Sequence, residues 1–358
     1  MRDVRALPKA HLHLHLTGSM RLGTLHEFAA AYQIPLPPAL RSTSVSWTGT
    51  DRDWSVFQAR YDAARNTIRS ADDLRRVIRE TAEDDAADGS GWLELQVDPT
   101  SYASRFGGFG GVVEVLLQAC RDAAAATGVG IGLIVATSWA RSGEHASTLA
   151  RLAARYAGRG VVGFGISGDE RCGLPADFVA ACRIAATAGL LRTPHAGYYT
   201  GPEHVRECVD VLGATRIGHG ITAVQDRRLL DHLAAQAVAL EICPTSYEPM
   251  GVLPSIHQLP VTALLDAGVR VAIGADDPLL LGTRLAGQYQ LLRDVLGIDD
   301  EQLAVLAQHS IATSAAPTAI KRRLTAGVDD WLAYRAQQRA QPTAAQRVPS
   351  LGRSRSVR

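Results

Sequence analysis

Lysine is scarce in this sequence of 358 residues: Lys9 and Lys321 are the only two, although lysine and arginine together number 37. A surplus of either charge is also missing, because 36 acidic residues leave a formal net charge of +1. A chain without a basic surplus has little electrostatic attraction for a phosphate backbone. We therefore expect no nucleic-acid partner.

Long apolar runs are absent as well. No stretch approaches the roughly 20 apolar residues that a membrane helix needs, and the opening MRDVRALPKA lacks the apolar core of a signal peptide. The five cysteines are odd in number and scattered, without a CxxC pair. These absences predict a cytoplasmic protein without a membrane partner, in which cysteines act as small hydrophobic residues. The sequence leaves the oligomeric state open.

Short apolar runs alternate with longer amphipathic stretches, as in repeated strand–helix units. Eight strands are expected, at residues 9–16, 91–98, 130–137, 161–167, 189–195, 216–221, 238–244 and 269–276. Eight such units predict an α/β protein with a (β/α)8 TIM barrel, in which active-site residues lie at the C-terminal ends of the strands.

Two segments depart from the strand–helix repeat. Residues 19–90 form a long insertion with extra helices after the first strand, where Trp54, Phe57 and Tyr61 share a helix face. That spacing favours core packing, with an apolar lid over a substrate site as the alternative. Residues 337–358 are rich in Gln, Ala, Ser, Pro and Arg without periodicity. We expect a single barrel domain over residues 1–336 and a disordered basic tail over 337–358.

The sequence HLHLH at residues 11–15 indicates metal chemistry. Alternate side chains of a strand share a face, so His11, His13 and His15 are expected to point into the barrel while the leucines pack outward. A lone histidine is more often structural. Two imidazoles at positions i and i+2 of a strand end can bind one ion.

Further candidate ligands end other predicted strands. His195 ends the fifth, His219 lies in the sixth, and Asp276 and Asp277 end the eighth. Imidazole nitrogens with one carboxylate suit zinc, although iron or manganese would also fit.

The shortage of lysine bears on the number of ions. Barrel hydrolases with two bridged metals often use a carbamylated lysine on a middle strand. Neither Lys9 nor Lys321 can occupy such a place. A single ion per chain is therefore favoured.

With these residues in place, the sequence resembles the adenosine deaminase family of the amidohydrolase superfamily. The resemblance covers nearly everything except the tail, and the order and spacing of its motifs agree with the family. Those motifs are LPKAHLHLHLTGS, VVGFGISGDE, PHAG, RIGHGI, EICPTS and GADDPLLLGT. The resemblance implies a zinc-dependent enzyme that replaces the 6-amino group of adenosine, or of a similar purine nucleoside, by oxygen and releases ammonia.

The same resemblance assigns the zinc site. One Zn²⁺ per chain would be held by His13, His15, His195 and Asp276, with a water as the remaining ligand. The ion would lower the pKa of that water towards about 7. His15 would also border the substrate.

Roles in binding and catalysis follow from the resemblance too. His219 would act in catalysis together with Asp276, by orienting the attacking water and stabilising charge at carbon 6. Asp277 would face ring nitrogen 7, and the backbone of Gly168 would meet nitrogen 3.

One position breaks the family pattern. A glutamate that protonates ring nitrogen 1 follows HAG in family members, whereas here the next residue is Tyr198. Glu203 keeps register with the start of the next helix and is not a replacement. A phenol can donate a hydrogen bond, but a reference pKa near 10 makes it slow to surrender the proton. Its ring is expected to fill space beside nitrogen 1.

Two other positions differ from many members of the family. Thr17 stands where an aspartate would lie near the ribose, and Tyr247 replaces an asparagine near the mouth of the site. These changes leave three hypotheses open. The protein is a deaminase of adenosine or a modified purine nucleoside, a metal-dependent C–N hydrolase or cyclase acting on another heterocycle in specialised metabolism, or a catalytically impaired ligand-binding paralogue.

Overall fold

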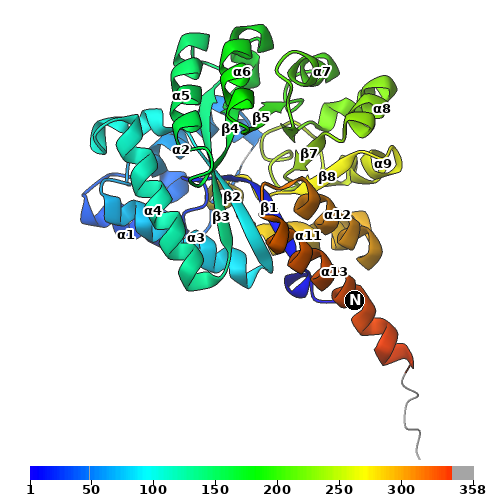
Figure 1. Ribbon diagram of the computed structural model, residues 1–358. Helices are drawn as coiled ribbons and strands as arrows, with labels where there is room; N and C mark the ends of the chain where they lie inside the picture. The colour runs from blue at the N-terminus through cyan, green and yellow to red at the C-terminus, as the bar shows by residue number, and fades with distance from the viewer. Residues whose placement is uncertain (48, 341–358) are drawn as a thin grey trace, which may run out of the picture.

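Eight parallel strands form the centre of the computed structural model, which describes residues 1–47 and 49–340 (Figure 1). They are hydrogen-bonded in chain order: β1 Lys9–His15, β2 Ser90–Val97, β3 Gly130–Ser138, β4 Val161–Ser167, β5 Leu191–Ala196, β6 Arg216–His219, β7 Ala239–Ile242 and β8 Arg270–Ile273. The barrel closes where the Asp276 amide donates to the His13 carbonyl and the His15 amide donates to the Asp276 carbonyl, each at 3.1 Å. The predicted (β/α)8 barrel is confirmed.

Helices surround the strands on the outside of the barrel (Figure 1). The insertion after β1 contains α1 Leu22–Ala31, α2 Trp54–Arg65 and α3 Ala71–Ala87. The others are α4 Phe109–Thr127, α5 Gly143–Arg155, α6 Val179–Thr187, α7 Pro202–Asp210, α8 Arg227–Gln236, α9 Val261–Asp266, α10 Pro278–Leu281, α11 Leu285–Leu296, α12 Asp300–Thr313 and α13 Thr318–Ala340.

Helix ends follow local sequence signals. Ser70 and Asp73 form a capping box at the start of α3, in which each side chain accepts a backbone amide of the other residue. Gly128 and Gly297 end α4 and α11 in the left-handed conformation that glycine adopts at little cost. These signals set where each helix begins and ends, and hence where the loops above the barrel start.

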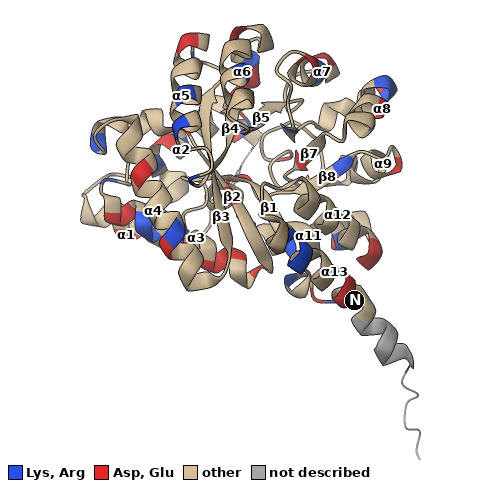
Figure 2. Ribbon diagram, viewed as in Figure 1, with Lys and Arg blue, Asp and Glu red and all other residues tan. Residues whose placement is uncertain are grey.

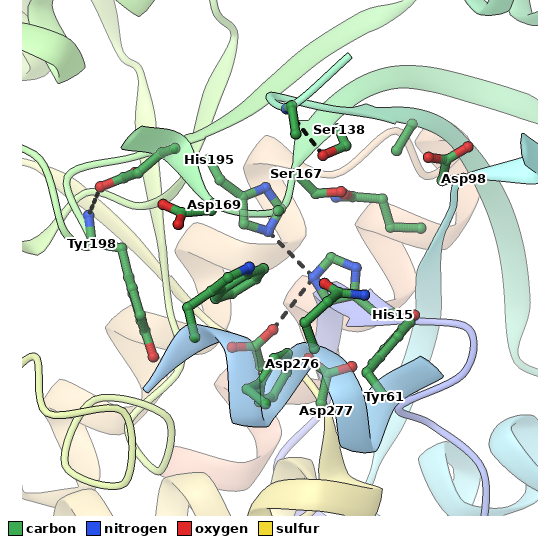
Figure 3. Close-up of a pocket in the computed structure, with 18 of the residues that line it drawn as sticks. His15, Tyr61, Asp98, Ser138, Ser167, Asp169, His195, Tyr198, Asp276 and Asp277 are labelled. Carbon is green, nitrogen blue, oxygen red and sulfur yellow. Dashed lines mark hydrogen bonds and ion pairs between the residues drawn. The ribbon is translucent and has the colours of Figure 1, made fainter. Parts of the chain in front are cut away.

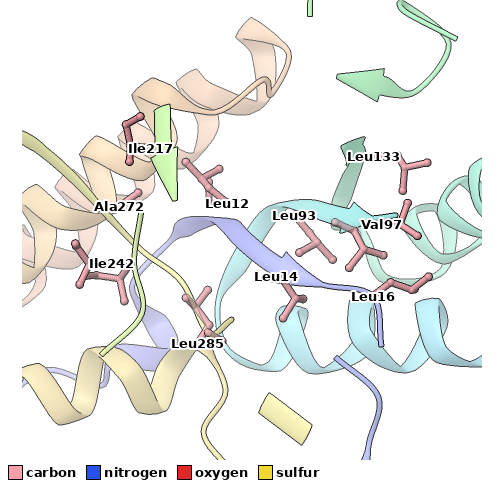
Figure 4. Packing of buried hydrophobic residues seen from close by; sticks show 14 of the residues in the cluster. Leu12, Leu14, Leu16, Leu93, Val97, Leu133, Ile217, Ile242, Ala272 and Leu285 are labelled. Carbon is pink, nitrogen blue, oxygen red and sulfur yellow. The ribbon is translucent and has the colours of Figure 1, made fainter. Parts of the chain in front are cut away.

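The main hydrophobic core lies between the strands and the outer helices. Leu12 and Leu14 of β1 are buried there with Leu93, Leu133 and Ile217 from other strands (Figure 4). Both signs of charge are spread over the outer helices, as on α3 (Figure 2). Apolar packing on the outside of the strands leaves their inward positions free for polar residues.

One of the three histidines of β1 does not join the others. His11 Nδ1 lies 2.9 Å from the Asp85 carboxylate of α3, and His11 Nε2 accepts the amide of Ala275. The register of β1 against β2 shifts between Lys9 and Ala10 and again between His11 and Leu14. Simple alternation therefore does not hold along this strand, and the expectation that all three histidines point into the barrel is wrong for His11.

A buried ion-pair chain crosses the interior of the barrel below the site. The guanidinium of Arg216 on β6 donates to Glu94 of β2 and, at 2.5 Å, to Glu241 of β7. All three side chains are at most 1% exposed. Burial opposes ionisation of Glu241, but Arg216 and His13 outweigh it and lower its pKa from 4.5 to about 2. The chain ties three strands together across the barrel.

The cysteines, the C-terminal helix and the hydropathy of the helices can each be compared with the expectations from the sequence. All five cysteines are free thiols, and every one except Cys172 is buried. Helix α13 continues to Ala340, beyond the domain boundary predicted after residue 336. The predicted tail from 341 to 358 lies outside the described residues. Within the described part of the chain, no helix has the length and apolarity to cross a bilayer. A cytoplasmic location stays a prediction.

Replacing Arg216 by methionine should destabilise the fold by about 3–5 kcal/mol, because two buried carboxylates lose their counter-ion. Urea unfolding monitored by circular dichroism measures this free energy. Arg227→Met is the matched control, since Arg227 forms an exposed pair with Asp231 and such pairs contribute at most about 1 kcal/mol. Equal stability of the two variants would contradict the importance of the buried chain.

Candidate active site

A cavity of about 500 Å³ opens at the C-terminal ends of the strands. Its volume falls within the range of small-molecule sites. His15, His195, Asp276 and Asp277 lie at its base, and Asp98, Ser138 and Ser167 lie on another side (Figure 3). Most of these residues end a strand or directly follow one, as the barrel architecture predicts.

Four proposed metal ligands converge at the base of this cavity. Asp276 Oδ1 is 3.4 Å from His13 Nε2 and 3.3 Å from His15 Nε2. His15 Nε2 is in turn 3.2 Å from His195 Nε2 (Figure 3). These donors come from three separate parts of the chain and belong to overlapping groups whose ligand atoms could hold one metal ion.

The unoccupied hydrogen-bonding capacity of these residues fits a cation. His13 Nδ1 is 2.9 Å from Glu241 and His195 Nδ1 is 3.0 Å from the Ile166 carbonyl, so the Nε2 atom of each ring is directed to the cluster. His13 Nε2 is buried and has no hydrogen-bond partner among the described residues. Metal-binding histidines are usually oriented in this way by a carboxylate or carbonyl on the other nitrogen.

Burial and neighbouring charges shift the pKa values of these histidines in opposite directions. Burial opposes a charge on His13, but Asp276 and Glu241 outweigh it and raise its pKa to about 10. Burial and the nearby histidines lower the pKa of His195. Burial also lowers the pKa of His219 to about 3, although Asp276 acts in the opposite direction. A neutral His195 beside an ionised Asp276 suits a divalent ion, whose charge would replace the proton on His13.

His219 and Asp276 are held in strained backbone conformations. Their φ angles are +69° and +60°, in the left-handed region that residues other than glycine rarely occupy. Such strain is common where a side chain must be aimed at a functional site. His219 Nε2 lies 3.9 Å from Asp276 Oδ2, at the edge of the cluster.

Asp277 lies beside the cluster, packed against Gly18. Asp277 Oδ1 is buried without a partner among the described residues, and a Cβ atom at Gly18 would lie only 1.8 Å from it. Burial and the adjacent Asp276 raise the pKa of Asp277 well above its usual value. The side chain can therefore present a protonated carboxyl to a ligand.

Gly168 lines the cavity directly after β4. Its φ of +84° favours glycine, and a Cβ atom there would lie 2.8 Å from Ser138 Oγ. The backbone at Gly168 thus borders the cavity without a side chain in the way.

Tyr198 lines the cavity, but its hydroxyl is already engaged. The hydroxyl donates to the Ser246 carbonyl at 3.0 Å, and the ring lies against His219 with centroids 4.4 Å apart. Burial raises the pKa of the phenol well above 10. The phenol is therefore poorly suited to release a proton.

Two residues expected to touch substrate do not line the cavity. Thr17 is fully buried, with its hydroxyl 2.5 Å from that of Tyr102, which does line it. Tyr247 is also fully buried, 3.4 Å from His219 Nδ1, and lies behind that residue rather than near the mouth. Thr17 and Tyr247 therefore do not contact a ligand in the cavity directly. They support residues that line the cavity, Tyr102 and His219, from behind.

The aromatic face of α2 corrects another expectation. Trp54, Phe57 and Tyr61 all line the cavity, and of these Phe57 also belongs to the buried core. The sequence favoured core packing, but the structure supports the alternative, in which this face covers a ligand site.

Sequence reasoning missed several supporting residues. Glu170 Oε1 accepts the backbone amides of residues 198–200 and so holds the turn that carries Tyr198. Trp139 donates to the His195 carbonyl at 2.9 Å. Glu241 orients His13. A glutamate at an inward position of an otherwise apolar strand was a usable signal for Glu241, whereas partners that meet only in the folded chain have no local signal.

Comparisons with known proteins agree with this geometry. The family model described as adenosine deaminase matches residues 8–331. The chain belongs to the adenosine deaminase family. It is accordingly a hydrolase that acts on C–N bonds, and metal binding is typical of its family.

Relatives of this chain include bacterial proteins described as deaminases of different compounds. A Streptomyces coelicolor protein, provisionally described as an adenosine/adenine deaminase, is 51% identical over 93% of this chain and 98% of its own. An adenine deaminase from Agrobacterium fabrum is 33% identical over 90% and 98% of the two chains. An aminodeoxyfutalosine deaminase from Streptomyces avermitilis is also 33% identical, over 92% of each.

Solved structures with the same fold include an adenine deaminase from Arthrobacter aurescens. It superimposes with a TM-score of 0.83 at 28% identity and covers 91% of this chain and 99% of its own. An amidohydrolase from Burkholderia ambifaria with bound Zn has a TM-score of 0.84 at 24% identity, over 95% and 94% of the two chains.

Glu241→Gln should weaken metal binding by about 10- to 100-fold, because the amide orients and polarises His13 less well than a carboxylate does. Chelator competition followed by elemental analysis measures the affinity, and the wild type should bind one divalent ion per chain. The exposed Asp231→Asn is the control. Wild-type protein without bound metal, or equal affinities of wild type and Glu241→Gln, would contradict the assignment.

Proposed function

We propose that this protein is a zinc-dependent hydrolytic deaminase that acts on adenosine or on a modified adenosine-like purine nucleoside. The 6-amino group becomes a 6-oxo group and ammonia is released. The observation that carries the proposal is the convergence of His13, His15, His195 and Asp276 at the base of a cavity of nucleoside size.

Relatives support both the reaction and the metal. Three relatives at 33% identity or more are described as deaminases of adenosine, adenine or aminodeoxyfutalosine. A structural neighbour contains bound Zn, and three imidazoles with one carboxylate are ligands that zinc prefers. One ion held by His13, His15, His195 and Asp276 would supply an activated water at neutral pH.

The residues around the metal cluster orient the attacking water, stabilise charge and contact the purine ring. His219, held beside Asp276, orients the attacking water and stabilises charge as carbon 6 changes geometry. Asp277 faces ring nitrogen 7 and the backbone of Gly168 faces nitrogen 3. The aromatic face of α2 shields the substrate from bulk water, which strengthens these polar interactions.

The charges around the cavity favour a substrate without a phosphate group. Among the described residues that line it, the arginines are Arg65 and Arg141, and Arg65 is already paired with Asp62. Asp98 and Asp169 add negative charge to the same lining. A nucleotide would meet one unpaired cation there, so an uncharged nucleoside or base fits better.

Tyr198 favours the alternative that the substrate is another heterocycle. Removal of a positioned general acid costs about 10²- to 10⁴-fold in rate. A metal-dependent C–N hydrolase or cyclase whose substrate needs no proton from this position would tolerate the phenol. A ligand-binding paralogue without turnover is the third candidate, because Tyr198 is the one departure that removes a reacting group.

Ammonia release from zinc-loaded protein tests the proposal. Adenosine, deoxyadenosine, adenine and N6-methylated analogues form the panel, and at least one should be deaminated. Tyr198→Glu should raise turnover of adenosine by about 100-fold or more, since it restores the missing acid. Tyr198→Phe separates the effect of the carboxylate from loss of the phenol.

Different outcomes select different candidates. If the metal-loaded wild type releases ammonia from none of the compounds in the panel, the proposed purine deamination is wrong. If adenosine turnover appears only in Tyr198→Glu, the natural substrate is a different heterocycle. Zinc binding with neither activity would favour the ligand-binding paralogue.

A further inference from the structure

Tyr247 connects His219 to the backbone at the end of β7. The amide of Cys243 donates to the Tyr247 hydroxyl at 3.2 Å, and the same hydroxyl lies 3.4 Å from His219 Nδ1. Tyr247 is fully buried and His219 is 5% exposed. The contact is therefore sheltered from water, and its direction is set by the groups that take part in it.

The protons available to the Tyr247 hydroxyl set the direction of its hydrogen bond with His219. A backbone amide only donates, so the phenol oxygen accepts from Cys243. The single proton of the phenol then has one recorded acceptor among the described residues, which is His219 Nδ1. The opposite direction would leave the buried hydroxyl proton without a partner, and an unmade buried hydrogen bond is costly.

We propose that Tyr247 is a positioning residue that keeps His219 in the tautomer with its proton on Nε2. An Nδ1 atom that accepts a hydrogen bond carries no proton, so the proton of the neutral ring is on the other nitrogen. Nε2 is the atom that faces Asp276 Oδ2 across 3.9 Å, at the edge of the ligand cluster. Tyr247 thus makes His219 a hydrogen-bond donor towards the reacting centre.

The neighbouring tyrosine does not provide an equivalent donor. Tyr198 packs on His219, but its hydroxyl proton is directed to the Ser246 carbonyl. The rings of Tyr198 and Tyr247 lie 5.4 Å apart on the same histidine. One tyrosine fixes the position of the imidazole and the other fixes its proton. The kinetic consequence rests on the proposed function, whereas the tautomer does not.

Nitrogen-15 NMR of histidine-labelled, zinc-loaded protein tests the tautomer directly. The signals of His219 are identified by their loss in His219→Gln. In the wild type, Nδ1 should have the shift of an unprotonated acceptor and Nε2 that of a protonated nitrogen. In Tyr247→Phe, the two shifts should move towards each other as both tautomers become populated.

Steady-state kinetics on a purine that the wild type deaminates provides the second measurement. Tyr247→Phe should lower kcat by about 10-fold, the value of one buried hydrogen bond, with KM changed by less than about twofold. Tyr289→Phe is the matched control, since Tyr289 is equally buried and does not line the cavity. Its kcat and the NMR shifts of His219 should equal those of the wild type.

The outcomes separate this inference from the proposed function. A wild-type His219 protonated on Nδ1 would overturn it, whether or not Tyr247→Phe folds. Unchanged NMR shifts in a folded Tyr247→Phe would overturn it too, as would an unchanged kcat. If no purine is deaminated but the shifts respond as expected, the proposed function fails and the tautomer assignment stands.

Discussion

The guanidinium of Arg216, held between two buried glutamates, is the interaction on which the site depends. Glu241 uses one oxygen for Arg216 and the other for His13, so the ion pair in the barrel interior also orients a candidate metal ligand. Without this cation, Glu94 and Glu241 would be two like charges in an apolar interior, which is costly. The charge chain therefore serves stability and chemistry through the same carboxylate.

The strained and buried parts of the molecule converge on the same few atoms. His219 and Asp276 have left-handed backbones, Asp277 leaves no room for a side chain at residue 18, and Glu170 holds the turn from 198 to 200. The two left-handed backbones store some free energy that packing elsewhere must offset. Strained backbone of this kind is typical of active sites and of ligand-binding sites.

Tyr198 and Tyr247 contact one histidine, His219, from different sides. Tyr198 packs its ring on His219 and donates its hydroxyl proton to the Ser246 carbonyl. Tyr247 lies behind His219 and contacts Nδ1. The proposed change in chemistry therefore concerns the protons around His219, whereas the candidate ligands for a metal ion lie together at the base of the cavity. Specificity can change in this way without loss of the nucleophile.

Periodicity and motif order were sufficient to predict eight strands, the barrel, and the strand ends that carry His13, His15, His195, His219 and Asp276, because in a parallel barrel those ends share one rim. Local sequence could not show that a register shift takes His11 to Asp85, that Thr17 and Tyr247 lie behind the wall, or that the aromatic face of α2 covers the cavity. Those outcomes depend on which side chains from distant segments form hydrogen bonds with one another in the folded chain. Only the folded chain brings these partners together.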